Sequence, residues 1–507
     1  MIESRIRFAV AIATVVVMVG CGGTNSGSTG GTGAAGGTGG IAGTGGAAGM
    51  GGASGMGGAA GMGGAAGMGG AAGTGGAAGM GGASGMGGAA GEGGTGGVIP
   101  TRQWGTAILI EAGNEDASGP QVAFDASGNA VAVWFQSDGT NGRIWASWYV
   151  PTQGWANPEL ISPAMVTSAV PRVGADSSGN AIAVWRQQTG LFGAWANRYT
   201  PGTGWGTAEG IGAIDTAAGD FAIEVAVNPD GDAMSVWHQG DGMRKNIWAN
   251  RFASVGGWQT AELIESENGG DAKNPQVAVD ANGNAIAVWQ QNDGMDNYAA
   301  ANRYTPGGGW GTDLSIDNAP GVSSRPQVAS DAAGNAIAVW PGIGVRANRY
   351  AQGVGWGTAE DIRSDVTGGL GAPEVAVSPD GHAIAVWPQT DGTRANLWAN
   401  RYEPGSGWGT AELIETDNAG GVQWPQVAVD PDGNAVAVWH QSDGTRTNIW
   451  ANQYVADLGW ATAELIETED LGDAERPQIA VDPDGNAIAV WYQDDGTHIN
   501  VWANRLE

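Results

Sequence analysis

The chain has 507 residues, with 21 basic against 51 acidic side chains and a single cysteine. Such an acidic surface repels phosphate backbones, so no nucleic acid is expected as a partner, and one cysteine excludes an intramolecular disulfide. Residues 1–101 hold two basic and two acidic side chains, so the net charge of −30 belongs to the rest of the chain. That charge suits solubility, cations or a cationic partner.

The N-terminus has the pattern of an export signal. Two arginines stand within residues 1–7, and the run FAVAIATVVVMV after them is apolar over twelve residues. A spanning helix needs about twenty apolar residues, so the pattern predicts a secretory signal peptide over residues 1–20. The sequence Met18-Val19-Gly20-Cys21 resembles a bacterial lipobox, with Met18 where leucine is usual.

The lipobox resemblance implies that Cys21 is lipidated and becomes the mature N-terminus. Gly22 follows it, which in the Gram-negative lipoprotein pattern implies sorting to the outer membrane. We therefore expect a membrane attachment through the N-terminal lipid, with the rest of the chain facing the periplasm or the cell surface. The alternative is an ordinary signal peptide followed by an unmodified cysteine.

Residues 21–99 consist almost entirely of Gly, Ala, Thr, Ser and Met, with the unit GMGGAA recurring from Gly49. Glycine at every third residue also occurs in collagen, but the triple helix relies on proline, and this stretch has none. It also has too few large side chains to form a core. We predict a flexible linker with an r.m.s. reach on the order of 50 Å.

Residues 100–507 spell out nearly the same passage eight times. A regular period of this size predicts a repeat architecture, and the units average about 51 residues. The tryptophan that closes the AVW core of each unit stands at Trp134, Trp185, Trp237, Trp289, Trp340, Trp387, Trp439 and Trp491.

The unit that begins at Pro425 shows four apolar or alternating runs, PQVAVD, AVAVWHQ, IWANQY and AELIE. The turn sequences DPDGN and SDGTRTN and a turn that contains Gly-Trp separate these runs. Short strands at regular spacing, each followed by a turn, are typical of all-β folds. Four strands in about 51 residues correspond to one propeller blade. The sequence therefore predicts an all-β, eight-bladed β-propeller of four-stranded blades.

The two ends of the repeat region belong to one blade. The region opens with QWGTAILIE, which matches the fourth strand, and closes with NVWANRLE, which matches the third. Pairing them would close the ring and remove two open sheet edges. Eight copies of each strand favour eight blades, and seven blades with a spare strand are the alternative. No feature of the sequence indicates an oligomer, and we expect a monomer.

The passage PQVAVDPDGNAVAVW resembles the start of an NHL-type propeller repeat, in which an Asp-x-x-Gly-Asn turn joins two inner strands. It resembles more loosely the Asp-box of sialidase-like propellers, although the acid, glycine and tryptophan are spaced differently here. Both resemblances concern the fold of residues 102–507.

Chemistry-bearing motifs are few. The acidic DPDGN turns suggest either calcium loops or Asx turns in which the first Asp binds its own hairpin. The four histidines fit no metal motif, so no cofactor is expected, with calcium as the open alternative. Six units carry an arginine after WAN or its equivalent, which we expect to pair with an acid of the neighbouring blade. These are Arg198, Arg251, Arg303, Arg349, Arg401 and Arg505.

Of the 24 tryptophans, 22 occupy three recurring positions, which indicates a packing role. A ligand does not share eightfold symmetry, so the places where the repeat is broken are the better candidates for a site. The residues at these breaks, which we predict to contact a ligand, are Trp148, Phe192, Tyr298, Arg346 and Trp424.

No catalytic motif stands out, and no catalytic residue is predicted. The near-identity of the units favours a binding or adhesion protein whose ligand is a polysaccharide or a protein. The alternatives are a propeller enzyme that acts on extracellular glycans, such as a glycosidase or lyase, and a structural scaffold without a ligand.

Overall fold

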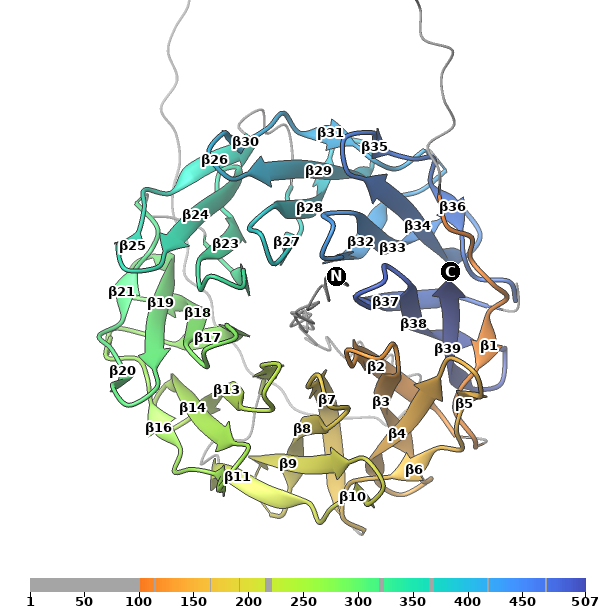
Figure 1. Ribbon diagram of the computed structural model, residues 1–507, viewed down its shortest axis with the longest axis horizontal. Coiled ribbons are helices and arrows are strands. Elements are labelled where there is room, and N and C mark those ends of the chain that lie inside the picture. Colours follow the sequence, from red (N-terminus) through yellow and green to blue (C-terminus); the bar gives the residue numbers. More distant parts are fainter. Residues whose placement is uncertain are drawn as a thin grey trace, which may run out of the picture. The chain divides into compact units, whose positions relative to one another are not determined.

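The computed structural model describes residues 101–507 except 114, 165, 191, 215–220, 319–322, 364–368, 417–418 and 470–471. The predicted signal peptide, Cys21 and the linker lie outside the described residues. The described strands form eight antiparallel sheets that are arranged around one axis (Figure 1), which confirms the eight-bladed all-β propeller. Among the described residues, no helix is long and apolar enough to cross a membrane.

Each blade has its first strand nearest the axis and its third and fourth strands at the rim (Figure 1). The first strands are β2 (Ala117–Phe124), β7 (Thr167–Ala175), β12 (Ile223–Val227), β17 (Ala272–Val279), β22 (Gln327–Ser330), β27 (Glu374–Val377), β32 (Val422–Val429) and β37 (Ala474–Val481). The second strands are β3 (Ala130–Ser137), β8 (Ala181–Gln188), β13 (Ala233–Gly240), β18 (Ala285–Asn292), β23 (Ala336–Pro341), β28 (Ala383–Thr390), β33 (Ala435–Ser442) and β38 (Ala487–Asp494). The third strands are β4 (Gly142–Val150), β9 (Phe192–Thr200), β14 (Lys245–Ala253), β19 (Asn297–Thr305), β24 (Val345–Ala351), β29 (Ala395–Glu403), β34 (Thr447–Val455) and β39 (Ile499–Leu506).

The fourth strand of blades one to seven is split into two short pieces, both paired with the third strand. The first pieces are β5 (Gly154–Trp155), β10 (Gly204–Trp205), β15 (Gly257–Trp258), β20 (Gly309–Trp310), β25 (Gly355–Trp356), β30 (Gly407–Trp408) and β35 (Gly459–Trp460). The second pieces are β6 (Glu159–Leu160), β11 (Glu209–Ile214), β16 (Glu262–Leu263), β21 (Leu314–Ser315), β26 (Glu360–Arg363), β31 (Glu412–Leu413) and β36 (Glu464–Leu465). The prediction that Gly-Trp belongs to a turn is therefore wrong. A positive φ at this glycine, +97° at Gly459, bends the chain back onto the third strand at once.

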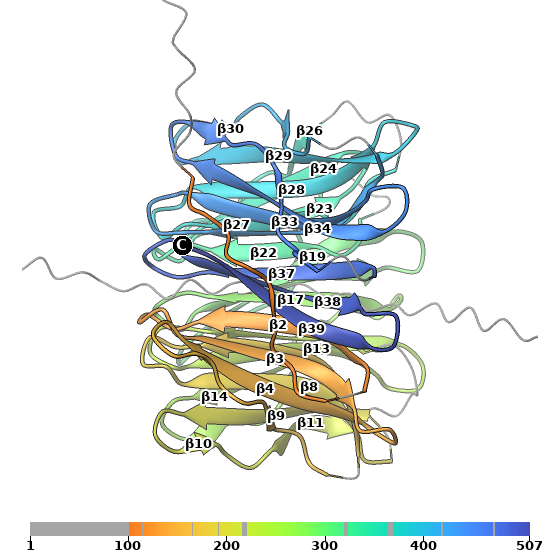
Figure 2. The same cartoon turned by 90° about the vertical axis from the view of Figure 1, so that its right-hand side faces the viewer.

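The ring closes as the sequence predicted. In blade eight the fourth strand is β1 (Ile108–Leu109), which pairs with β39 through Ile108 opposite Ala503. The two segments lie side by side in both views (Figures 1 and 2). Upstream of β1, the Gln103 amide donates to the Glu507 carbonyl at 3.0 Å, and the Gly105 amide donates to the Arg505 carbonyl at 2.8 Å. The first described segment thus completes the last blade, and the alternative of seven blades is wrong.

The core of the propeller lies between the blades. Each cluster of buried apolar side chains combines two neighbouring blades, as when Trp491 of blade eight packs with Val438 and Ile449 of blade seven. The second strands are buried on both faces, which explains why they read as continuous apolar runs. All eight AVW tryptophans have an exposed fraction of 0%, which confirms their predicted packing role.

A side-chain amide joins most neighbouring blades. Asn452 Nδ2 donates to the Ile414 carbonyl of the preceding blade at 2.8 Å and to the Ala461 carbonyl of its own blade at 3.0 Å. Asparagines at this position of blades two to eight make the same pair of bonds. Blade one has Ser147 instead, whose hydroxyl donates to the Ala156 carbonyl. The junction that closes the ring therefore lacks the asparagine bridge.

The two sides of the ring carry different connections. Because the strands alternate in direction, the turns from first to second and from third to fourth strands share one side, which we call the hairpin face. The turns from second to third strands and the links between blades share the other side, the connection face. In the side view (Figure 2), these turns project from both sides of the ring.

Candidate functional site

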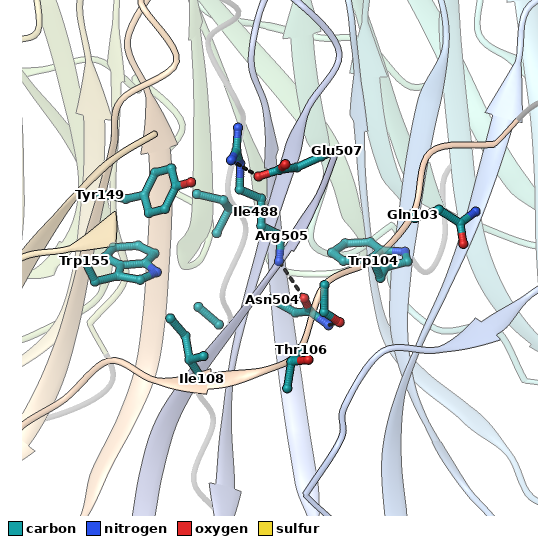
Figure 3. A pocket seen from close by; sticks show the side chains of 12 residues that line it. Gln103, Trp104, Thr106, Ile108, Tyr149, Trp155, Ile488, Asn504, Arg505 and Glu507 are labelled. Atoms are coloured by element: carbon teal, nitrogen blue, oxygen red, sulfur yellow. Dashed lines mark hydrogen bonds and ion pairs between the residues drawn. The ribbon is translucent and has the colours of Figure 1, made fainter. Parts of the chain in front are cut away.

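A cavity of about 440 Å³ opens between blades eight and one, at the rim near the hairpin face. Figure 3 shows Tyr149 and Trp155 of blade one on one side of it and Trp104 on the other, with Arg505 between them. We call this cavity the junction cleft. Its lining includes Trp104, Tyr149, Trp155, Ile488, Arg505 and Glu507.

Strand pairing sets the aromatic wall of the junction cleft. Tyr149 of β4 lies directly opposite Trp155 of β5, and their ring centroids are 5.5 Å apart at an interplanar angle of 58°. The guanidinium carbon of Arg505 lies 5.1 Å from the centroid of the Tyr149 ring, within the range of a cation–π contact. Arg505 Nη1 also donates to the Glu507 carboxylate. The cleft thus combines an apolar aromatic surface with a charged pair at its edge.

The same aromatic pair recurs in every blade from one to seven. A Tyr or Phe near the end of the third strand faces the Gly-Trp tryptophan, with centroids 5.5–5.7 Å apart. The further pairs are Tyr199–Trp205, Phe252–Trp258, Tyr304–Trp310, Tyr350–Trp356, Tyr402–Trp408 and Tyr454–Trp460.

The recurring arginines were expected to pair with acids of the neighbouring blade, and for four of them this is wrong. The guanidinium groups of Arg198, Arg303, Arg401 and Arg505 lie 5.1–5.8 Å from the centroid of the Tyr or Phe ring of the next blade. The ring presents its electron-rich face where a carboxylate was expected. Arg251 does form an ion pair, at 2.6 Å, but with Asp232 of its own blade. The stacked arginines occur at every second junction.

Trp148 occupies the arginine position of blade one. Its ring lies 4.4 Å from that of Tyr199 of blade two, and it packs against the core between these blades. It therefore takes the place of the stacked arginine at this junction. Trp148 is half-buried and lies toward the hairpin face, whereas the other four predicted contact residues lie toward the connection face.

These four residues belong to four different blades, so the structure does not bring the five together. Phe192 in blade two lies under the guanidinium of Arg186, at 4.4 Å. Tyr298 in blade four packs on the core between blades three and four, and burial raises its pKa to about 12. Arg346 in blade five pairs with the carboxylate of Asp317 at 3.6 Å.

Trp424 in blade seven is the fourth of them. Its backbone φ is +51°, and the guanidinium of Arg476 lies 4.6 Å from its ring centroid. Its ring lines a second cavity on the connection face. A ligand-contact role for all five residues stays a prediction.

The DPDGN turns have the geometry of Asx turns. Asp482 Oδ1 accepts from the amides of Asp484 and Asn486, and its Oδ2 accepts from Asn486 Nδ2 at 2.8 Å. Gly485 takes a φ of +84°, as the turn requires. Within the described part of the chain, no group of three or more His, Cys, Asp or Glu is placed to hold a metal ion. Calcium binding at these turns stays a prediction.

Sequence reasoning assigned the Gly-Trp tryptophans to packing alone and did not identify the cleft. The signal that could have found it is the constant spacing of six residues between the Tyr or Phe and this tryptophan, as from Tyr149 to Trp155. A positive φ at the intervening glycine brings the two rings onto the same side of the sheet.

Neither a protein-family profile nor a curated protein matches the sequence. Among solved structures, the BP39L lectin of Burkholderia pseudomallei is similar over 71% of this chain and 100% of its own, at 13% identity and a TM-score of 0.48. A protein of unknown function from Dyadobacter fermentans is similar over 81% and 100%, at 14% identity and a TM-score of 0.43. The lectin AAL of Aleuria aurantia, solved with Fucα1-6GlcNAc, is similar over 72% and 99%, at 10% identity and a TM-score of 0.37. Likeness at this level says nothing about a shared ligand.

Proposed function

We propose that this protein binds carbohydrate at the clefts between its blades, with the junction cleft as the best-formed site. The observation that carries the proposal is the combination of Tyr149 and Trp155 with the Arg505–Glu507 pair around one open cavity. A sugar ring has an apolar C–H face that packs on aromatic rings. Its hydroxyl groups exchange hydrogen bonds with charged side chains at the edge of such a site.

The recurrence of the aromatic pair supports a polymeric ligand. Seven blades present the pair at the rim, and at four junctions an arginine of the preceding blade lies against it. Repeated weak sites on a rigid ring bind a repeating ligand with far higher avidity than any one site provides. A polysaccharide is therefore the preferred ligand over a single small sugar.

The cleft favours binding over hydrolysis. Glycoside hydrolysis ordinarily needs two carboxyl groups on either side of the scissile bond. Among the described residues that line the junction cleft, Glu507 is the one carboxylate, and Arg505 engages it. A lipid on Cys21 and the long linker would hold this binding domain at the outer membrane, facing the periplasm or the cell surface.

The test uses the full chain in detergent on an array of bacterial and plant polysaccharides, followed by calorimetry with the best oligosaccharide. Trp155→Ala should remove one site from the measured stoichiometry and lower the avidity for the polymer. Met243→Ala, an apolar change at an exposed turn between β13 and β14 on the connection face, is the control and should bind as the unchanged protein does. Release of shortened products would replace the binding function by an enzymatic one. Absence of binding to every glycan would favour the scaffold.

A further inference from the structure

A second cavity, of about 330 Å³, lies on the connection face where blades five, six and seven meet. We call it the blade-six pocket. Its apolar wall is formed by Leu370, Pro388, Val422 and Trp424. Two charged side chains, those of Arg325 and Glu374, also line it. It shares no residue with the junction cleft.

One wall of the pocket is the irregular segment ahead of the first strand of blade six. The strand β32 of blade seven is eight residues long, whereas β27 has four and begins only at Glu374. Ahead of β27, Leu370 forms a single bridge with Gln389, and the Gly371 amide donates to the Pro388 carbonyl at 2.9 Å. The backbone at Leu370 and Gly371 thus follows β28, and the pocket lies between this segment and blade seven.

Backbone strain places the two side chains that flank the space. Trp424 and Arg325 occupy equivalent positions, each directly before a proline, with φ of +51° and +44°. Non-glycine residues rarely adopt this left-handed conformation. Both side chains line the pocket as a result.

Arg325 brings a positive charge to the pocket. Among the described residues, Arg325 has no partner in a hydrogen bond, ion pair or ring contact, although it is only partly exposed and the chain has a net charge of −30. Glu374 is buried, with an exposed fraction of 6%. Burial raises its pKa well above the usual value, and the nearby charge of Glu224 acts in the same direction. A neutral Glu374 would not repel an incoming carboxylate.

We propose that the blade-six pocket binds a small carboxylic acid with an apolar body of about one ring. The carboxylate pairs with the guanidinium of Arg325, and the body packs against Trp424, Leu370 and Pro388. A cavity of about 330 Å³ is at the lower end of the size of ligand sites, which suits such a molecule. This site is independent of the carbohydrate clefts.

The test measures binding of 3-phenylpropionate to the full chain by ligand-observed NMR and calorimetry, with the uncharged 3-phenylpropanamide as the matched ligand. The acid should bind at least tenfold more tightly than the amide. Arg325→Gln should remove this preference, and Ala395→Trp should abolish binding of both, because Ala395 lines the pocket and a large side chain there fills it. Arg505→Gln, in the junction cleft, should leave the affinity for the acid unchanged.

The proposal is overturned if the acid does not bind, if acid and amide bind alike, or if Arg325→Gln retains the preference. Thermal unfolding of each variant establishes that it is folded. Polysaccharide binding by Arg325→Gln is measured in parallel and should be unaffected. A failure of this pocket is thereby distinguished from a failure of the carbohydrate clefts.

Discussion

The indole Nε1 of Trp340 donates a hydrogen bond to a carboxylate oxygen of Asp317 at 3.1 Å. In the other seven blades, the same indole group donates to a glutamine two residues further along the chain, as in Trp491 to Gln493. Blade five has Gly342 at that position because its turn is shortened. Asp317 follows β21 of the preceding blade, so the neighbouring blade supplies the acceptor. The same carboxyl group pairs with Arg346, which gives this repeat break a structural function.

Replacing Asp317 with alanine should therefore destabilise the protein more than its loss of charge suggests. The buried Trp340 N–H would lose its acceptor, which costs about 1–3 kcal/mol, and Arg346 would lose a buried partner. Asp361→Ala is the matched control, because Asp361 also pairs with Arg346, at 3.8 Å, but is half exposed. Its loss should change the free energy of unfolding by about 0–1 kcal/mol. Urea unfolding measures the stability of both variants. An equal loss of stability in the two would contradict the role of Asp317 as the acceptor for Trp340.

Closure of the ring should depend on Ile110. This side chain, just after β1, has an exposed fraction of 4% and packs in the core between blades eight and one. Ile110→Ala should cost about 2–5 kcal/mol by leaving a cavity. Limited proteolysis of this variant should cut first in blade eight. Leu109→Ala, one residue away on the exposed side of the strand, should be nearly neutral. Equal sensitivity of the two variants would mean that the ring is not held at this point.

The sequence predicts the architecture well because a repeat states the same pattern eight times. The burial of Trp491 and its equivalents, the number of blades and the pairing of the first segment with β39 follow from counting strand types. The split fourth strand does not follow, since a two-residue piece such as Gly459–Trp460 has no periodicity to detect.

The candidate sites are harder to predict, because they depend on contacts between blades. Nothing in the sequence shows that Arg505 meets Tyr149, which lies more than 350 residues away in the chain. The repeat breaks include Trp424, which lines the blade-six pocket. They also include Arg346, which forms an ion pair with Asp317 of the preceding blade. A break in the repeat therefore accompanies either a cavity or a compensating contact between blades, and distinguishing the two requires the structure.

The junction that closes the ring should be improvable. In seven blades an asparagine on the third strand bonds to the preceding blade, as Asn452 does, whereas blade one has Ser147 at this position and lacks that bond. Ser147→Asn should add a hydrogen bond from the new amide to the backbone carbonyl of Ile110, and it should raise the free energy of unfolding by about 1 kcal/mol. The reverse change, Asn452→Ser, should lower it by about 1–3 kcal/mol, because a buried carbonyl loses its donor. The melting temperatures of the two variants should shift in opposite directions. A lower melting temperature for Ser147→Asn would contradict the view that an asparagine bridge fits at this junction.

Acid should destabilise the protein through His440. This side chain has an exposed fraction of 5%, and its Nδ1 accepts from the Arg476 amide at 3.3 Å. Burial lowers its pKa from 6.5 to about 4, and the charge of Arg476 adds to the effect. The unfolded chain therefore takes up a proton first, and stability is lost as the pH falls from about 6.5 towards 4. His440→Gln places at this position the residue that blade four has as Gln290, and it should reduce the loss of stability between pH 6.5 and 4. His498→Gln, at a half-exposed turn, should leave that loss unchanged.

Glu265 should make stability depend on pH in the opposite direction, over an overlapping pH range. Its side chain has an exposed fraction of 1%, and the nearest cation is Arg244, at 3.8 Å. Burial raises its pKa from 4.5 to about 7, against the attraction of Arg244. Between these two values the folded protein holds a proton that the unfolded chain has released, so stability falls as the pH rises from about 4.5 to 7.

Glu265→Gln keeps the shape of the side chain and removes its titration. The variant should melt at a higher temperature than the unchanged protein at pH 8 and at a similar temperature at pH 4.5. Glu262→Gln is the matched control, because Glu262 lies exposed on β16, three residues before Glu265. Melting temperatures across pH 4.5–8 for the three proteins test this directly. If Glu265→Gln follows the pH profile of the unchanged protein, the buried carboxyl group is already ionised at pH 4.5. Arg244 must then stabilise its charge more strongly than burial opposes it.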